Sequence, residues 1–147
     1  MYWLKPFYSF RGRTNRARFW LVSITASVYS EVLMLLWDSS DLAQGTAAGK
    51  FLLAAAFLPA IVSCLAVCVT RLHDRNKSAW WLVPFLVAPM ALETVAQVND
   101  LDAALTVGLM VLSGTLSLWA LVELGVLRGS VGANAYGPDP VADMATA

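Results

Sequence analysis

The chain has 147 residues, of which 59% are hydrophobic and 14% are charged, and its mean hydropathy is +0.64. This length suits a single domain, and the apolar composition excludes an ordinary soluble fold and indicates a membrane protein. The ten basic and ten acidic residues cancel to a formal net charge of zero, so the total charge does not favour a nucleic-acid partner and we expect none.

Four apolar segments are each about 20 residues long, the length that a helix needs to cross the hydrocarbon core of a bilayer. They cover residues 19–37, 51–70, 79–98 and 105–127. Polar connections separate them, and segments such as FLLAAAFLPAIVSCLAVCV lack the polar stripe of a helix in a soluble bundle. We therefore predict an all-α membrane protein with one domain of four transmembrane helices over residues 1–140, followed by a short flexible tail, residues 141–147.

Basic residues are unevenly distributed between the two sides of these spans. Cytoplasmic loops of membrane proteins accumulate Lys and Arg, and only Lys50 lies in the first or third connection. The other nine are Lys5, Arg11, Arg13, Arg16, Arg18, Arg71, Arg75, Lys77 and Arg128. We therefore predict that both termini are cytoplasmic, as an even number of spans requires. The first apolar run lacks a convincing cleavage site, so we expect a retained helix and not a signal peptide.

The second connection, RLHDRNKSAWW (residues 71–81), carries more charge than topology requires. Asp74 lies within reach of Arg71 and Arg75, and Ser78 is placed to cap the next helix. Trp80 begins that helix, where an aromatic ring suits the headgroup layer of a bilayer.

The N-terminal flank, SFRGRTNRARFW, places four arginines immediately before Phe19 and Trp20. The planar guanidinium group of arginine can donate two parallel hydrogen bonds to the oxygens of a phosphate. One interpretation is that this flank and the second connection form one basic surface with an aromatic rim; the other is that their charges only fix the topology among anionic lipids.

A third stretch, GANAYGPDP (residues 132–140), follows the last span. Its glycine and prolines block helix continuation, and its Asn134 and Asp139 favour turns. We expect a compact turn that packs back onto the arginine surface, with Asp139 or Asp143 paired to a cation, so that the three stretches assemble one site.

FRGRTNRARFW, RLHDRNKSAWW and GANAYGPDP occur in the order and spacing of the YhaH-like bacterial inner-membrane proteins, the domain-of-unknown-function 805 family, which the chain resembles over nearly its whole length. The matching residues are Gly12, Arg13, Arg16, Phe19, Trp20, Arg71, Leu72, His73, Asp74, Ser78, Trp80, Trp81, Gly132, Asn134, Tyr136, Gly137, Asp139 and Pro140. Ala79 stands where the family pattern has glycine. The resemblance implies a multi-pass protein of the bacterial inner (plasma) membrane, and it implies no established activity.

Two acids, Glu31 and Glu93, fall inside the first and third spans. With a rise of about 1.5 Å per residue, we expect both carboxylates about 8 to 9 Å below the outer surface. An intramembrane acid is a functional candidate by default, and the alternative is snorkelling or a hydrogen bond to a neighbouring helix. We expect Glu123, near the cytoplasmic end of the fourth span, to neutralise Arg128 or Arg71.

Three prolines, Pro59, Pro84 and Pro89, lie inside the second and third spans. They can kink these helices and free backbone carbonyls for a binding site, or they only shape the packing. Cys64 and Cys68 lie one helical turn apart, and we expect free thiols that pack against a neighbouring helix.

The sequence contains no HExxH, GxSxG or P-loop motif, and no nucleophile accompanies the adjacent His73 and Asp74. We therefore expect a non-catalytic accessory or scaffold subunit, without metal or cofactor, whose basic cytoplasmic face binds anionic lipid headgroups or a larger membrane complex. One alternative is a small oligomeric transporter or channel that uses Glu31 and Glu93; a third is a membrane enzyme acting on lipid headgroups. The candidate binding surface comprises Arg11, Arg13, Arg16, Arg18, Trp20, Arg71, His73, Asp74, Arg75, Lys77, Trp80, Trp81, Asn134, Tyr136 and Asp139.

Overall fold

The computed structural model describes residues 5–39, 46–98 and 101–142, and its regular elements over these residues are all helical. In chain order they are α1 (Lys5–Tyr8), α2 (Arg16–Ser39), α4 (Ala47–Ala56), α5 (Leu58–Asp74), η1 (Ala79–Trp81), η2 (Val83–Val87), α6 (Ala88–Val98), α7 (Ala103–Leu121) and η3 (Val122–Val126). The prediction of an all-α protein is confirmed.

Four helical segments are long and apolar enough to cross a membrane, which confirms the predicted number of spans. Their bounds are Arg16–Trp37, Ala47–Asp74, Ala79–Val98 and Ala103–Val126. The first three residues of α2 precede the predicted start, because the side chain of Asn15 accepts a hydrogen bond of 2.9 Å from the Arg18 N–H and caps the helix. Thr46 and Asp102 likewise cap α4 and α7 through their side-chain oxygens.

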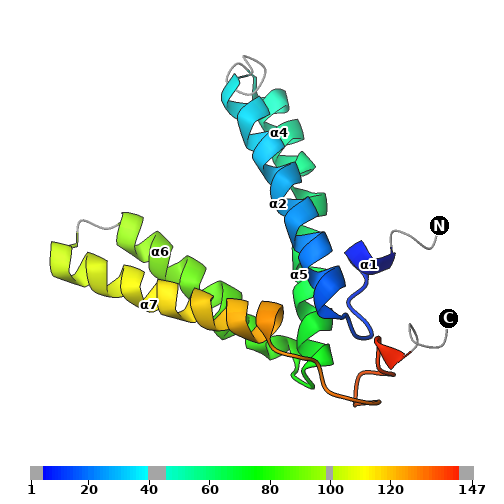
Figure 1. Cartoon of the computed structure of the whole chain (residues 1–147). Coiled ribbons are helices and arrows are strands. Elements are labelled where there is room, and N and C mark those ends of the chain that lie inside the picture. The colour runs from blue at the N-terminus through cyan, green and yellow to red at the C-terminus, as the bar shows by residue number, and fades with distance from the viewer. Residues whose placement is uncertain (1–4, 40–45, 99–100, 143–147) are drawn as a thin grey trace.

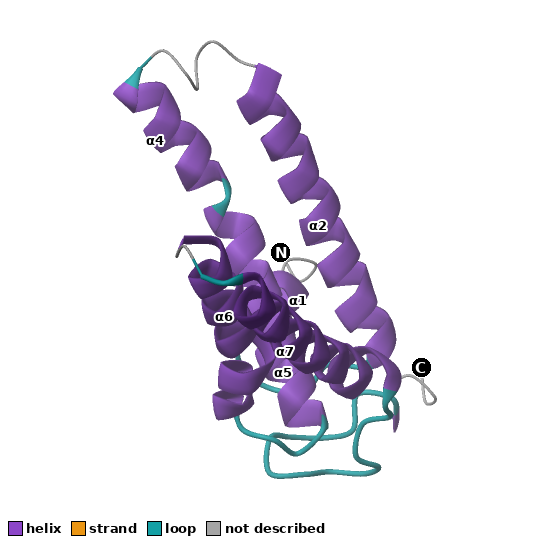
Figure 2. Ribbon diagram, turned by 90° about the vertical axis from the view of Figure 1, so that its left-hand side faces the viewer, coloured by secondary structure: helices purple, strands orange, loops and turns teal. Residues whose placement is uncertain are grey.

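The helices form two arms that diverge from a shared base (Figure 1). In one arm α2 packs against α5, and in the other α6 packs against α7. Figure 2 shows that α2 and α4 diverge toward the far end of the first arm. Within the described part of the chain, the backbones of the two arms approach each other only near the base, where η1 and η3 contact α5 and η3 also contacts α2. We use "the base" below for this end of the molecule, which also holds α1 and the turn at residues 129–142.

Prolines mark the places where the second and third spans depart from a regular α-helix. The second span is interrupted at Phe57, between the end of α4 at Ala56 and the start of α5 at Leu58, and Pro59 lies in the first turn of α5. Proline has no N–H to continue the hydrogen-bond ladder, which accounts for the break between the two helices. Pro84 lies in the π-helical turn η2.

The buried apolar core lies where the two arms meet. Its residues come from α2, α5, η2 and the end of the fourth span: Phe19, Val22, Val67, Leu72, Phe85, Ala120 and Leu124. The Phe85 ring packs edge-on against Trp119, with 5.0 Å between ring centroids. Further along the arms the outer faces are exposed and apolar, for example Leu35 and Val111, which suits contact with lipid chains. The core therefore fixes the base rather than the full length of the arms.

Candidate functional site

Asp74, the last residue of α5, is the centre of the base. Its Oδ1 accepts hydrogen bonds from Nε and Nη2 of Arg13, at 3.1 and 3.0 Å, and its Oδ2 accepts one from Nη1 of Arg71. The side chains of both arginines are only 1% exposed. One buried carboxylate is therefore shared by two buried guanidinium groups, which come from two motifs far apart in the sequence.

Arg71 also ties α5 to the end of the fourth span. Its Nε donates to the carbonyl of Leu124 at 2.7 Å, and its Nη2 donates to the carbonyl of Leu127. The last carbonyls of a helix have no partner within the helix. The guanidinium group of Arg71 supplies these partners, and so it holds the two arms together at the base.

Arg13 ties the C-terminal turn to the base in the same way, through backbone carbonyls. Its Nη1 donates to the carbonyl of Gly132 and its Nη2 donates to the carbonyl of Ser130. The N–H and hydroxyl of Ser130 donate in turn to the backbone carbonyl of Asp74, at 2.8 and 3.0 Å. These bonds join the N-terminal flank, the second connection and the turn into one network.

The turn also packs directly on the second connection. The side-chain amide of Asn134 donates to the His73 carbonyl at 2.9 Å. The rings of His73 and Tyr136 are stacked, with centroids 4.0 Å apart and planes 5° apart. At the ring edge, Nδ1 of His73 lies 3.2 Å from the carbonyl oxygen of Gly12. Gly12 has a φ of +86°, a conformation that favours glycine. The structure thus brings the three sequence motifs together.

Of the two acids predicted to pair with a cation, Asp139 or Asp143, the structure describes only Asp139. Asp139 does not pair with a cation: it accepts hydrogen bonds from the N–H groups of Val141 and Gly132, at 2.9 and 3.0 Å, because it lies inside the turn that it shapes. These two N–H groups hold the pKa of the Asp139 carboxyl below its ordinary value. Asp143 lies outside the described residues.

The prediction that Glu123 neutralises Arg128 or Arg71 is wrong. It pairs with Arg75 and Lys77, each at 3.0 Å, because the guanidinium group of Arg71 is directed to Asp74 and to backbone carbonyls. The ammonium group of Lys77 also lies 4.0 Å from the ring centroid of Trp81. This second cluster links the hairpin to the fourth span.

The expected cap at Ser78 is also wrong. Ser78 has the extended backbone of a cap residue, but its hydroxyl forms no capping hydrogen bond. The element that follows is a single 3₁₀ turn, in which the Trp81 N–H bonds to the Ser78 carbonyl at 3.2 Å.

Two tryptophans of the predicted surface lie in different surroundings. Trp20 donates from Nε1 to the carbonyl of Gly125 at 3.1 Å, so its ring is held against η3. Trp80 is 81% exposed. Only the second ring is therefore available as an unobstructed aromatic anchor.

Sequence reasoning missed several residues that build the base. Gly129 is one, because a Cβ atom at this position would lie 2.0 Å from Oδ2 of Asp74. The hydroxyls of Thr14 and Thr70 form another contact, a buried hydrogen bond of 2.9 Å that docks the N-terminal flank on α5. A glycine outside a turn motif and a threonine inside an apolar span have no local signal that reveals such contacts.

The remaining arginines of the base are exposed and differ from Arg13 and Arg71. They are Arg11, Arg16, Arg18 and Arg128. None of them forms an ion pair with an acid of the described residues; Arg16 donates from Nη1 to the Val126 carbonyl at 3.0 Å. The cations of the base thus divide into a paired structural set and an exposed set.

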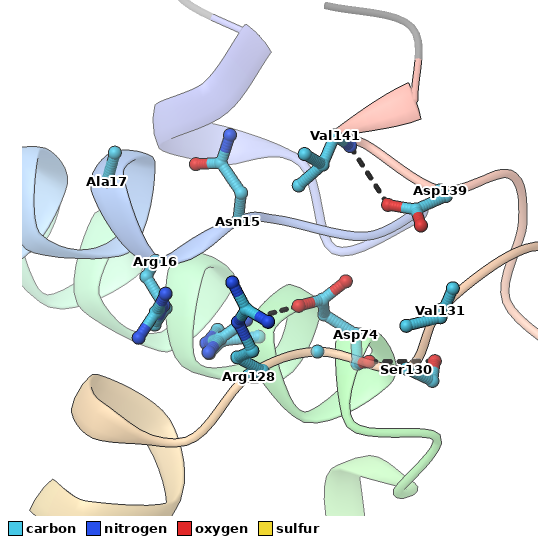
Figure 3. A pocket seen from close by; sticks show the side chains of 11 residues that line it. Asn15, Arg16, Ala17, Asp74, Arg128, Ser130, Val131, Asp139 and Val141 are labelled. Atoms are coloured by element: carbon cyan, nitrogen blue, oxygen red, sulfur yellow. Dashed lines mark hydrogen bonds and ion pairs between the residues drawn. The ribbon is translucent and has the colours of Figure 1, made fainter. Parts of the chain in front are cut away.

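A cavity of about 440 Å³ lies beside the network. Figure 3 shows residues from α2, the end of α5 and the segment after η3 gathered around it. It is lined by Asn15, Arg16, Ala17, Arg71, Asp74, Arg128, Gly129, Ser130, Val131, Asp139 and Val141. In the described ranges, no three His, Cys, Asp or Glu side chains are grouped so that they could hold a metal ion.

The two acids predicted to lie within the membrane are not brought together. Glu31 is exposed on α2, in one arm, whereas Glu93 is on α6 in the other arm, where it accepts a hydrogen bond of 2.7 Å from the Ser113 hydroxyl. Cys64 and Cys68 are free thiols.

The comparisons with known proteins agree with the pattern of motifs. Residues 7–138 match the family described as "Protein of unknown function (DUF805)". Over 138 residues the chain is 26% identical to "Inner membrane protein YhaH" of Escherichia coli K12, covering 93% of this chain and 91% of the relative. Over 137 residues it is 32% identical to "Uncharacterized protein YiiR" of the same strain, covering 90% and 86%. No solved structure matches. The chain belongs to the DUF805 family and is a multi-pass inner-membrane protein.

Proposed function

We propose that this protein is a non-catalytic membrane scaffold whose base faces the cytoplasm and binds the headgroups of anionic lipids. In this orientation both termini are cytoplasmic. The placement of Lys50 on the far side from the nine other cations supports the orientation, because cytoplasmic segments accumulate basic residues.

The observation that carries the proposal is the set of exposed arginines without an acidic partner, Arg11, Arg16, Arg18 and Arg128. The buried acids nearby, Asp74 and Glu123, each hold two other cations and so do not neutralise this set. A basic residue near an anionic leaflet contributes about 1 kcal/mol of attraction. Four such residues at the base therefore favour an anionic membrane surface.

The engagement of His73 and Asp74 supports a scaffold over an enzyme. Nδ1 of His73 contacts the Gly12 carbonyl and the ring stacks on Tyr136, and both oxygens of Asp74 accept hydrogen bonds from arginines. A general acid or base must reach the proton that it transfers. These two side chains instead join segments of the base.

Lipid retention in native mass spectrometry tests the proposal. Purified protein is equilibrated with equal amounts of phosphatidylglycerol and phosphatidylcholine, and the lipids that remain bound are counted. The wild type should retain phosphatidylglycerol preferentially, and the double variant Arg11→Gln/Arg18→Gln should lose much of this preference.

The matched control is Lys50→Gln, which removes one exposed positive charge from the opposite end of the molecule and should leave the preference unchanged. Equal retention of the two lipids by the wild type would contradict the proposal. Stoichiometric recovery of a larger protein subunit in place of lipid would favour an accessory role instead.

A small oligomeric transporter remains the alternative prediction. It requires Glu31 and Glu93 to serve one pathway, but they lie on different arms and Glu93 is bonded to Ser113. On the scaffold proposal, Glu31→Gln and Glu93→Gln should leave lipid retention unchanged; ion or solute flux in proteoliposomes that either variant abolishes would favour transport.

A further inference from the structure

We infer that the cavity of about 440 Å³ in the base is a binding site for a single phosphate ester. This inference rests on the proposed function and deepens it, because it assigns one ligand class to one place on the basic face. The volume falls within the range of about 300–1,000 Å³ that is typical of small-ligand sites.

Two cations of the exposed set line this cavity from separate segments. Arg16 comes from the first turn of α2, and Arg128 follows η3 (Figure 3). Nη1 of Arg16 donates to the Val126 carbonyl, which fixes the direction of the side chain. The other N–H groups of this guanidinium group are left to bind a ligand. Two guanidinium forks from different elements can hold the oxygens of one phosphate from two directions.

The charge balance around the cavity favours an anion over a metal cation. Asp74 and Asp139 also line it, but Asp74 is paired with Arg13 and Arg71, and both oxygens of Asp139 accept backbone N–H groups. Three cations, Arg16, Arg71 and Arg128, line the cavity; with Arg13, which pairs with Asp74 from outside the lining, four cations stand against two carboxylates. The two surplus positive charges balance the two negative charges of a phosphate monoester. They exceed the single negative charge of a phosphate diester by one.

The rest of the lining fits the organic part of an ester. Val131 and Val141 contribute apolar side chains to the cavity, and Ala17 contributes a methyl group from α2. The first turn of α2 contains no acidic residue, so the positive end of this helix reinforces the attraction for an anion. A phosphate bound by the arginines would therefore have an apolar wall beside its substituent.

Such a phosphate ester has two sources, a lipid headgroup or a soluble metabolite, and the probes distinguish them. Titration of the full-length purified protein with short-chain phosphatidylglycerol, glycerol 3-phosphate and inorganic phosphate is followed by isothermal calorimetry. One saturable site per chain supports the inference. Binding of the lipid alone identifies a headgroup site, whereas binding of glycerol 3-phosphate at similar affinity identifies a site for a free ester.

The variant Arg128→Gln should weaken this binding about tenfold, the effect of losing one charged hydrogen-bond donor. No hydrogen bond or ion pair of this exposed side chain supports the fold in the described residues, so the variant should fold normally. Arg16→Gln should have an effect of similar size, and a thermal melt of each variant checks that the base is intact.

The matched control is Arg11→Gln/Arg18→Gln, which removes two exposed arginines of the base that do not line the cavity. It should keep the saturable site while losing the general preference for anionic lipid. If the titration shows no saturable site, or if Arg128→Gln binds as tightly as the wild type, the cavity is not the site. The scaffold proposal is then tested separately, by the lipid retention of the control variant.

Discussion

At the scale of single residues, the base depends on how Arg13 and Arg71 are compensated. Burying a charge is costly unless it is paired and hydrogen-bonded. Both guanidinium groups meet this condition, since they share Asp74 and donate their remaining N–H groups to backbone carbonyls. A single carboxylate therefore pairs with two buried cations, and backbone carbonyls satisfy their remaining N–H groups.

Asp74→Asn should destabilise the protein by about 3–5 kcal/mol, because it leaves two buried arginines without a counter-charge. The measurement is thermal or chemical unfolding of the purified protein in detergent. Glu31→Gln, which removes an exposed acid of α2, serves as the control and should unfold like the wild type. An Asp74→Asn protein as stable as the wild type would show that the network does not hold the base.

Gly129→Ala should also destabilise the base, because the added Cβ atom would lie 2.0 Å from a carboxylate oxygen of Asp74. Gly108→Ala is the matched change on α7, where the added Cβ atom meets nothing within 4 Å. Alanine is the better helix former by about 1 kcal/mol, so this control should keep or raise the melting temperature. Equal melting temperatures for the two variants would contradict the close approach at Gly129.

At the scale of elements, the C-terminal turn acts as a clamp that closes over the second connection. It contributes no regular helix of its own, and its contacts with Arg13, His73 and Asp74 fix its position. Removal of these contacts should free the turn without affecting the spans, whose hydrogen bonds are internal.

This predicts a specific crosslink. In a protein whose Cys64 and Cys68 have been replaced by alanine, the pair His73→Cys/Tyr136→Cys should be joined by a short thiol-reactive reagent, because the two rings are stacked at 4.0 Å. Peptide mass spectrometry identifies the product. The pair Thr46→Cys/Tyr136→Cys, which places one thiol at the far end of an arm, is the control. Equal yields for both pairs, or no product for the first, would refute the clamp.

Much of this arrangement could be predicted from the sequence, because hydropathy is a local property that identifies the four spans and motif order suggests one assembled site. The sequence could not predict which arginines are buried in ion pairs and which are exposed. Arg11 and Arg13 have the same side chain and lie two residues apart, yet one is exposed and the other is buried on Asp74. No helical period applies in that flank, so only the tertiary contact with α5 separates them. The choice of Arg75 and Lys77 as partners of Glu123 depended on packing in the same way.

At the scale of the whole molecule, the two arms are joined at the base and present apolar outer faces elsewhere. The proposed orientation makes a prediction of its own. In intact cells, a membrane-impermeant maleimide should label Thr46→Cys, at the far end of an arm, but should label Val131→Cys, at the exposed base, only after the membrane is opened. The reversed pattern would overturn the orientation.

The central claim is that the exposed arginines of the base hold anionic lipid. Native mass spectrometry of the wild-type protein, extracted gently from its own membrane, tests this most directly. We predict a complex that carries anionic lipid in a defined number per chain and sheds it after substitution of the exposed arginines. A wild-type protein that emerges without anionic lipid, or bound in fixed ratio to a larger protein subunit instead, would contradict this account.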